Sequence, residues 1–252
     1  MPFTFSHPIF AAPLKLAKPR YLSITGLILG SMSPDFEYFI VLEPYQSIGH
    51  TWQGLLLQAF PLCLLFALLF HKIVKGTAAL HLPDWGGINS KLYRIALNNS
   101  WNLRSLAKLF IFFASVSIGF LTHMIVDAFT HKHGFFVTQI PFLEQIYGGI
   151  PVYKWLQRSL SLLGLAAEAV ILLALFTKQP DRLNGQERQA VQAVTTKEKR
   201  VYWLLVFTAM LAVTGMKLLL TSSANIIGIL VVAPISGFML GVLAASIMYK
   251  FR

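Results

Sequence analysis

The sequence LAKLFIFFASVSIGFLTHMIVDAFTHKHG, residues 106–134, decides the class of fold. Residues 106–129 form an almost uninterrupted apolar run, and about 20 such residues carry a helix across a bilayer. Near the end of the run, His123, Asp127 and His131 follow one another at intervals of four residues. On a helix this spacing places all three side chains on one face. The stretch therefore predicts a transmembrane helix with a polar face at one end.

That polar face is a candidate metal site. Imidazole and carboxylate groups are ligands of divalent ions, and ionisable side chains inside or beside a membrane span are functional candidates by default. The alternative is a buried, hydrogen-bonded pair of His123 and Asp127 without a metal. His133 lies beyond the expected helix and is compatible with either a loop role or a site role.

The composition extends the membrane interpretation to the whole chain. Of its 252 residues, 56% are hydrophobic and only 12% are charged, whereas a soluble domain has about a quarter charged residues. The mean hydropathy is +0.63. We expect an all-α, polytopic transmembrane helix bundle in one integral-membrane domain, residues 1–252, with an N-terminal hairpin and acidic turn in 1–50 and the bundle in 51–252.

The net charge indicates which partners to expect, and the cysteine count indicates whether a disulfide is possible. The formal net charge of +11 is expected in cytosolic loops that meet anionic membrane lipids. Nucleic-acid binding is not expected, because no basic stripe with interleaved aromatic residues appears in a soluble segment. The single cysteine, Cys63, lies in an apolar run, so a disulfide within the chain is excluded. The first ten residues lack a basic region and a cleavage site, so no removable signal peptide is expected.

Hydropathy predicts about five full spans and their orientation. The expected spans are residues 55–70, 106–129, 155–176, 201–220 and 226–249. The long connecting segments 71–105 and 178–200 are rich in Lys and Arg and are therefore expected in the cytosol. Residues 130–154 are poorer in basic residues and should face the other side, so the polar end of the 106–129 span is expected there as well.

The first 50 residues are expected to form a helical hairpin rather than a span. Ser6, His7 and Pro8 resemble a helix start, because serine caps helices and proline is common in their first turn. The chain turns at residues 18–20 and returns to a proline-containing turn at 33–35. A continuous span over residues 21–42, kinked at its proline, is the alternative.

This topology brings polar residues from the first half of the chain to one side of the membrane. Each has an ordinary explanation on its own, such as capping a helix or hydrogen bonding to the backbone. Their convergence on one face, with carboxylates and imidazoles together, favours a metal site. The converging residues are His7, Asp35, Glu37, His50, His123, Asp127 and His131.

Three short segments that contain some of these residues resemble a known protein family. The segments PFTFSHP (2–8), SPDFEYF (33–39) and GHTWQG (49–54) resemble a bacterial integral-membrane family of unknown function. A wider pattern runs through the chain: an early His, an Asp-containing turn, a His-Thr pair before a span, and His-x-x-x-Asp in a later span. This pattern carries a second resemblance. It distantly resembles the membrane-bound metal-dependent hydrolases and the zinc-dependent phospholipase C proteins. The resemblance covers roughly residues 2–135 by motif and the rest by hydropathy.

The resemblance implies a metal set and a function. It implies a multi-pass protein of the bacterial inner membrane that hydrolyses a lipid-borne ester or phosphoester at the non-cytosolic face, with a divalent metal ion, most simply zinc. Asp-Phe-Glu stands where Asp-x-Asp is usual in the hydrolases, and Glu37 is the expected general base. The alternative is a non-enzymatic protein with a structural metal or polar cluster, or an ion-binding transporter. The implied metal ligands are His7, Asp35, His50, His123 and Asp127.

Three further polar residues lie on the 155–176 span. Gln157 and Arg158 are expected at its non-cytosolic end, where they would support the cluster, bind an anionic headgroup or anchor the helix at the interface. Glu168 lies in mid-span, where a carboxylate needs a partner. Lys108 and Lys217 are the candidate partners, although both are expected at other depths.

The predicted orientation is testable by cysteine accessibility. Cysteines introduced into residues 71–105 or 178–200, or beside Lys250, should resist a membrane-impermeant thiol reagent in intact cells, because these segments are expected in the cytosol. A cysteine in 130–154 should react. Labelling of both long segments from outside would invert the topology.

Overall fold

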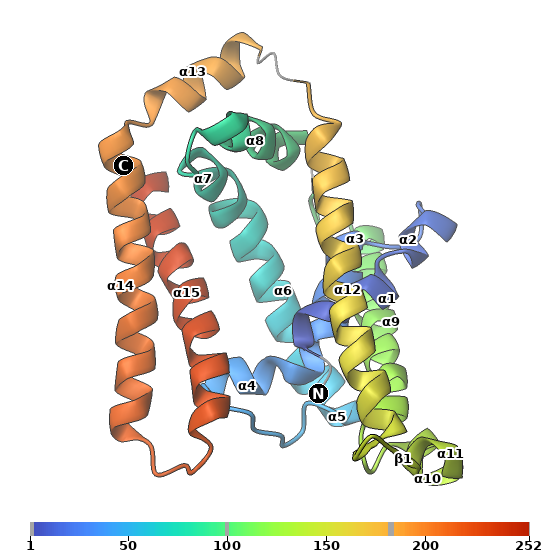
Figure 1. Cartoon of the computed structure of the whole chain (residues 1–252). Coiled ribbons are helices and arrows are strands. Elements are labelled where there is room, and N and C mark those ends of the chain that lie inside the picture. Colours follow the sequence, from blue (N-terminus) through green and yellow to red (C-terminus); the bar gives the residue numbers. More distant parts are fainter. Residues whose placement is uncertain (1–2, 99–100, 181–183, 252) are drawn as a thin grey trace. The chain divides into compact units, whose positions relative to one another are not determined.

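The computed structural model describes residues 3–98, 101–180 and 184–251, which are almost entirely helical (Figure 1). The only strands in these ranges, β1 (Ile146–Tyr147) and β2 (Ile150–Pro151), pair antiparallel in a small hairpin. Five helical stretches are long and apolar enough to cross a membrane. They are Trp52–Leu80, Leu106–Gln139, Val152–Thr177, Thr196–Leu220 and Ile226–Lys250. The expectation of an all-α polytopic bundle with about five spans is confirmed.

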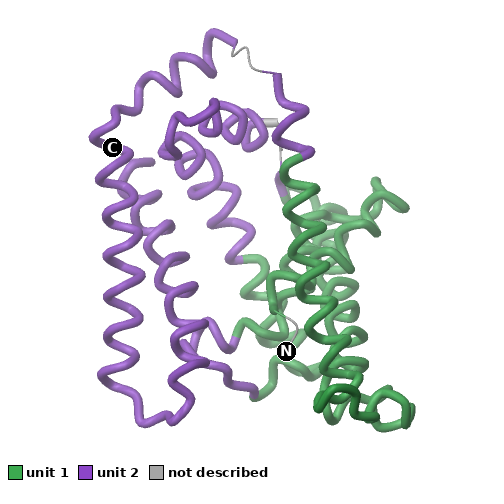
Figure 2. Tube along the Cα trace, viewed as in Figure 1, with its two compact units in different colours: residues 1–36, 47–64, 103–173 green, residues 37–46, 65–102, 174–252 purple. Residues whose placement is uncertain are grey.

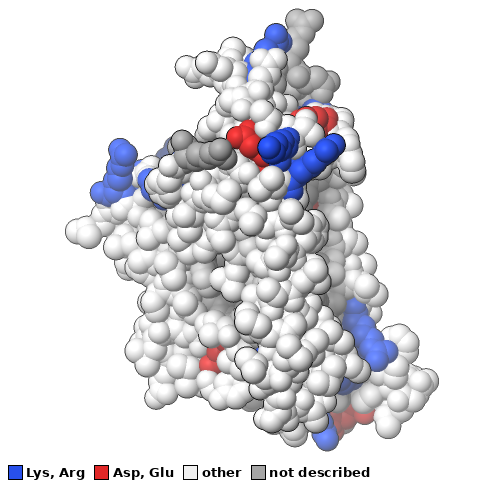
Figure 3. Space-filling view, turned by 90° about the vertical axis from the view of Figure 1, so that its left-hand side faces the viewer, with Lys and Arg blue, Asp and Glu red and all other residues white. Residues whose placement is uncertain are grey.

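Contacts between residues group the chain into two compact units (Figure 2). The first unit contains residues 1–36, 47–64 and 103–173, and the second contains 37–46, 65–102 and 174–252. This grouping leaves the single integral-membrane domain a prediction. On the face shown in Figure 3, the charged side chains lie in a few groups and most of the surface is uncharged, as the composition requires.

The first unit begins with the predicted hairpin. The outgoing arm consists of η1 (Thr4–Ser6), α1 (Pro8–Ala11) and α2 (Leu14–Ala17), and α3 (Ile24–Met32) returns. The Ser23 side chain caps α3, and η2 (Ser33–Asp35) and α4 (Phe36–Val41) follow it directly in the chain. Helical turns run without a break from Ile24 to Val41, with Pro34 in the 3-10 turn, so the alternative of a kinked span over residues 21–42 stays open.

Small residues allow α3 to pack directly against α9 (Leu106–Thr130). A Cβ atom at Gly30 would lie 2.2 Å from the carbonyl oxygen of Val116, and one at Gly119 would lie 2.4 Å from that of Leu27. Close backbone approach through small residues is the usual mode of helix packing in membranes. This contact fixes the position of the α9 polar face, along the helix axis, relative to the carboxyl end of α3.

Beyond α9 the chain forms a short, irregular segment before the next long helix. It contains α10 (Phe135–Gln139), α11 (Pro141–Glu144) and the β hairpin, and it leads into α12 (Val152–Thr177). Val137, Leu143 and Tyr153 are buried together and form a small core for this segment.

The first span differs in length from the sequence expectation of 55–70. Its helix runs through α5 (Trp52–Gly54), η3 (Leu55–Ala59), α6 (Phe60–Leu69), η4 (Phe70–Val74) and α7 (Lys75–Leu80). The elements η3 and η4 are π-helical turns, so the backbone stays helical past His71, where hydropathy had ended the span. Hydropathy detects where apolar residues stop, whereas the backbone helix continues through polar ones.

The second unit is built on two long antiparallel helices, α14 (Thr196–Leu220) and α15 (Ile226–Lys250). Tyr202, Val206 and Ala245 form its buried core. The segments between the spans add α8 (Ile88–Asn98), α13 (Gly185–Ala193) and the short η5 (Trp85–Gly87). A buried ion pair between Arg94 and Glu187, with an N···O distance of 2.6 Å, joins α8 to α13.

The close contact between α3 and α9 predicts a strong asymmetry between two glycine substitutions. Gly30→Ala should lower the free energy of unfolding by about 1–3 kcal/mol, because the added methyl group overlaps the Val116 backbone. Gly215→Ala, in the interior of α14, is the matched control, since no described atom lies within 4 Å of the added Cβ. Thermal unfolding of the detergent-purified variants measures both. Equal melting temperatures would contradict the packing.

Candidate metal centre

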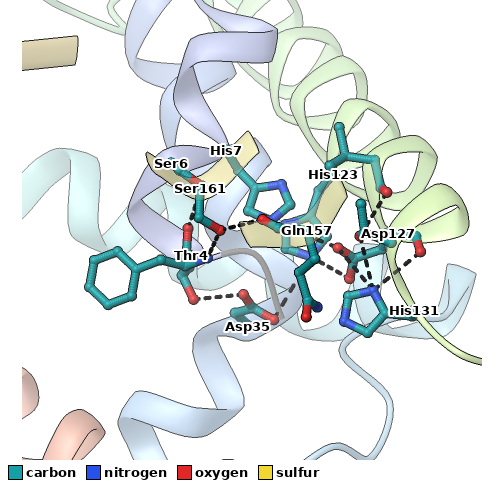
Figure 4. Close-up of polar contacts among 12 residues, drawn as sticks. Thr4, Ser6, His7, Asp35, His123, Asp127, His131, Gln157 and Ser161 are labelled. Carbon is teal, nitrogen blue, oxygen red and sulfur yellow. Dashed lines mark hydrogen bonds and ion pairs between the residues drawn. The ribbon is translucent and has the colours of Figure 1, made fainter. Parts of the chain in front are cut away.

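Five ionisable side chains from separate segments of the first unit lie close together, and four of them are labelled in Figure 4: His7, Asp35, His123 and Asp127. They belong to the sequence just before α1, to η2, to the loop before α5 and to one face of α9. The five are His7, Asp35, His50, His123 and Asp127. These are the residues that the sequence analysis assigned to a metal, and their roles as ligands stay a prediction.

The five side chains form two overlapping groups of three, His7, His123 and Asp127 in one and Asp35, His50 and His123 in the other, and the ligand atoms of each group lie within 4.8 Å of one another, close enough to hold an ion. Nε2 of His123 lies 3.3 Å from Oδ2 of Asp127 and 3.8 Å from Oδ1 of Asp35. Nε2 of His50 lies 3.5 Å from those same two oxygens, Oδ2 of Asp127 and Oδ1 of Asp35. Nε2 of His7 lies 3.8 Å from Oδ1 of Asp127. Ligands bound about 2.0–2.1 Å from one tetrahedral zinc ion lie about 3.3–3.4 Å apart.

Several buried polar atoms of the cluster have no hydrogen-bond partner among the described residues. They are both ring nitrogens of His7, Oδ1 of Asp35, Nδ1 of His50, Nε2 of His123 and Oδ1 of Asp127. An unsatisfied buried polar group is costly, and so many in one place call for an explanation. A cation would satisfy the ligand atoms that face one another, so the donor set fits a divalent metal.

One backbone carbonyl and one hydroxyl group orient two of the candidate ligand side chains. Nδ1 of His123 lies 2.8 Å from the carbonyl oxygen of Ser31, which leaves Nε2 toward the cluster. The Thr4 hydroxyl donates to Oδ2 of Asp35 at 2.7 Å and leaves Oδ1 toward the cluster. Such outer contacts fix ring tautomer and ligand direction in metal sites. The sequence analysis missed both residues, although each lies in a segment that it quoted or discussed.

Burial controls the electrostatics of the two ligand groups from the N-terminal hairpin. Burial, followed by the neighbouring His123, lowers the pKa of His7 well below its usual value. A neutral imidazole is the form that binds a metal. Burial raises the pKa of the Asp35 carboxyl group, because a negative charge removed from water loses the compensation that the solvent gives. A divalent cation beside both groups would supply that compensation.

The remaining candidates lie around the cluster or away from it. Nδ1 of His131 lies 3.5 Å from Oδ1 of Asp127, so this histidine borders the cluster. Gln157 is buried in α12, and Figure 4 shows its side chain beside the same group. Arg158 is exposed. Glu37 is buried in α4 and belongs to the second unit, so its role as general base stays a prediction.

The structure also bears on two other expectations about polar residues, through the exposure of one and the contacts of the other. His133 is exposed, which favours the loop interpretation. Lys217, one candidate partner of Glu168, donates to Glu43, its Nζ lying 2.9 Å from Oε1, whereas Lys108 stays a candidate. The backbone amide of Ile9 lies beside Glu168, although Oε1 of Glu168 has no hydrogen-bond partner among the described residues. The sequence offered only distant cations, whereas the hairpin brings a backbone donor to mid-span.

A comparison with protein families finds one match over nearly the whole chain. The model of a family described as a domain of unknown function (DUF4184) matches residues 1–247. No curated protein and no solved structure matches the chain. The match agrees with the expected membership of an uncharacterised family and carries no statement about activity.

The metal centre predicts which histidines matter for metal content. His7→Ala and His123→Ala should each lower metal affinity by more than the about 10–100-fold that loss of an outer contact costs, because each removes a ligand. His133→Ala is the control, since this histidine is exposed. Elemental analysis and metal titration of the purified proteins measure the effect. Wild-type protein without stoichiometric metal, or unchanged affinity in both variants, would contradict it.

Proposed function

The chain belongs to the DUF4184 family, and we propose from its metal centre that it is a membrane-embedded, metal-dependent hydrolase. Its substrate would be a lipid-borne ester or phosphoester at the non-cytosolic face of a bacterial inner membrane. The residues that would hold the metal are His7, Asp35, His50, His123 and Asp127, and zinc suits this set of nitrogen and oxygen donors.

One observation carries the proposal. Three imidazoles and two carboxylates gather in the protein interior, and four of their facing atoms have no hydrogen-bond partner among the described residues: His7 Nε2, Asp35 Oδ1, His123 Nε2 and Asp127 Oδ1. A purely structural polar cluster would be expected to satisfy its buried atoms internally. Strongly interacting groups in a shared site are also typical of functional sites.

The exposure of the cluster is uneven, and this favours catalysis over a closed structural site. The side chains of His7, Asp35 and His123 are about 1% exposed, whereas those of His50 and Asp127 are 12% exposed and that of His131 is 33% exposed. Water and substrate would therefore approach from the His131 side. A catalytic metal keeps a coordination position open to solvent, whereas a structural one does not.

The position of the cluster along the chain suggests the substrate class. Asp127 lies one turn before the end of α9, a helix long enough to cross a bilayer. A site at the end of a span faces the region where lipid headgroups and their ester bonds lie. A lipid-borne ester or phosphoester is the simplest molecule to reach it.

The chemical roles follow from the donor set. A bound divalent metal supplies a water of lowered pKa and polarises the scissile phosphoryl or acyl oxygen. The Ser31 carbonyl holds His123, and the Thr4 hydroxyl holds Asp35, so each presents its free ligand atom in a fixed direction. Glu37 as the base that accepts a proton stays a prediction from the sequence alone.

A structural metal is the second candidate. The near-complete burial of His7, Asp35 and His123 favours it, because ligands closed off from solvent are typical of structural sites. An ion-binding transporter has less support. Apart from Asp127 of the cluster, Glu168 is the one carboxylate in the interior of a described span, which is little for a polar path through the bilayer.

Hydrolysis by the purified protein tests the proposal. Protein in nanodiscs of extracted bacterial phospholipids should release lipid fragments, detected by mass spectrometry, only when loaded with zinc. Chelation should abolish release, and readdition of zinc should restore it. Asp127→Asn should lower turnover by at least about 100-fold, because it removes a ligand charge. His133→Ala should retain activity.

A second measurement separates catalysis from a structural metal. Cobalt-substituted protein should change its visible spectrum when inorganic phosphate is added, because an open coordination position accepts an anion. A spectrum that phosphate leaves unchanged, with no turnover of any lipid or of p-nitrophenyl esters, would reject the hydrolase and support the structural metal.

A further inference from the structure

The segment between α9 and α12 is an ordered element of its own. Residues 135–151, termed here the interfacial platform, contain α10, α11 and the β hairpin. Val137 and Leu143 are buried against Tyr153 at the start of α12. The rings of Phe129 and Phe136 stack with their centroids 4.0 Å apart, which fastens the platform to the end of α9. The platform is therefore held rigidly on two spans.

Helix lengths place the platform outside the hydrocarbon core. The 25 residues of α9 extend about 37 Å and the 26 residues of α12 about 39 Å, at about 1.5 Å per residue. Each already exceeds the hydrocarbon thickness of about 30 Å. The platform also contains a tight turn at Gly148 and Gly149, both with positive φ, and lipid-exposed turns do not occur in the hydrocarbon. It must lie at or beyond the membrane surface.

The outward side chains of the platform are large and apolar. Phe135, Phe142, Ile146 and Tyr147 are 66%, 55%, 69% and 54% exposed, although the segment has a core that could have buried such residues. Aromatic side chains gather at the headgroup level of membranes, where apolar ring and polar surroundings are both accommodated. Trp155 is also half exposed, and its Nε1 donates to the Tyr147 carbonyl at 3.0 Å.

The charged residues beside the platform complement anionic lipid. Lys132, Lys154 and Arg158 are exposed around it, against one exposed carboxylate, Glu144. Basic side chains next to a membrane span are attracted to anionic headgroups. Apolar contact area and flanking positive charge together are typical of elements that lie in the interface plane.

We infer that the platform rests in the headgroup region of the membrane that α9 and α12 cross, with Phe135, Phe142, Ile146 and Tyr147 inserted among anionic lipids. The bilayer surface, and not a partner protein, covers these apolar side chains. The platform begins four residues after His131, so it fixes the depth of the α9 polar face relative to lipid ester bonds. The inference does not depend on hydrolysis and holds equally if the metal is structural.

Spin labels at neighbouring positions test it. Phe142 and Glu144 are both exposed and lie about 200° apart around α11, so only one of them can face the lipid. In a Cys63→Ala background, single cysteines at 142, 144 and 146 carry a nitroxide, and the protein is placed in nanodiscs of phosphatidylglycerol and phosphatidylcholine. Collision rates with oxygen and with aqueous chromium oxalate report the depth of each label.

The labels at 142 and 146 should collide several-fold less with the oxalate than the label at 144, and more with oxygen. Equal collision rates at 142 and 144, whether both aqueous or both lipidic, would overturn the platform. The label at 146 repeats the test on the β hairpin if the variant at 142 does not fold. Metal content of the same samples is measured separately, so an aqueous platform with intact metal would leave the proposed hydrolase standing.

Discussion

The first unit depends on one electrostatic constraint, the burial of two carboxylates and three imidazoles at a single point. Charged and polar groups removed from water must be paired with one another or with an ion. Distances of 3.3–3.8 Å between the facing nitrogen and oxygen atoms are longer than good hydrogen bonds and suit a shared cation. A metal in this position would tie the N-terminal hairpin to α9 and would add its binding free energy to that of folding.

Helix packing supplies the geometry that this constraint needs. The glycines of α3 and α9 bring the two backbones into contact, and the amide of Ser23 donates to the Ser115 hydroxyl at 2.8 Å. At that separation the Ser31 carbonyl reaches the His123 ring. The rings of His7 and His123 stack with centroids 3.8 Å apart, so the hairpin also packs directly against the polar face of α9. Packing and coordination therefore reinforce each other.

The site combines closed and open sides, which is the feature that distinguishes the two candidate functions. The side chains of His7, Asp35 and His123 are about 1% exposed, whereas those of His50, Asp127 and His131 border a more accessible side. The interfacial platform begins four residues after His131, which borders the accessible side. A lipid headgroup held at the membrane surface would lie near the accessible ligands, so the platform and the hydrolase proposal are compatible without depending on each other.

The sequence by itself determined the membrane class, the approximate spans and the polar face of α9, because hydropathy and helical periodicity are local properties of the chain. It also indicated the hairpin, since a proline and a carboxylate at 33–35 are unfavourable in hydrocarbon. Through that hairpin it also predicted that His7 lies near His123, and the two rings stack in the structure. Only the tertiary structure decided that Thr4 hydrogen-bonds to Asp35, that the Ser31 carbonyl contacts His123, and that Lys217 pairs with Glu43. These pairs are separated by about 30 to 170 residues, and no periodic pattern reports on contacts that arise when helices pack against each other.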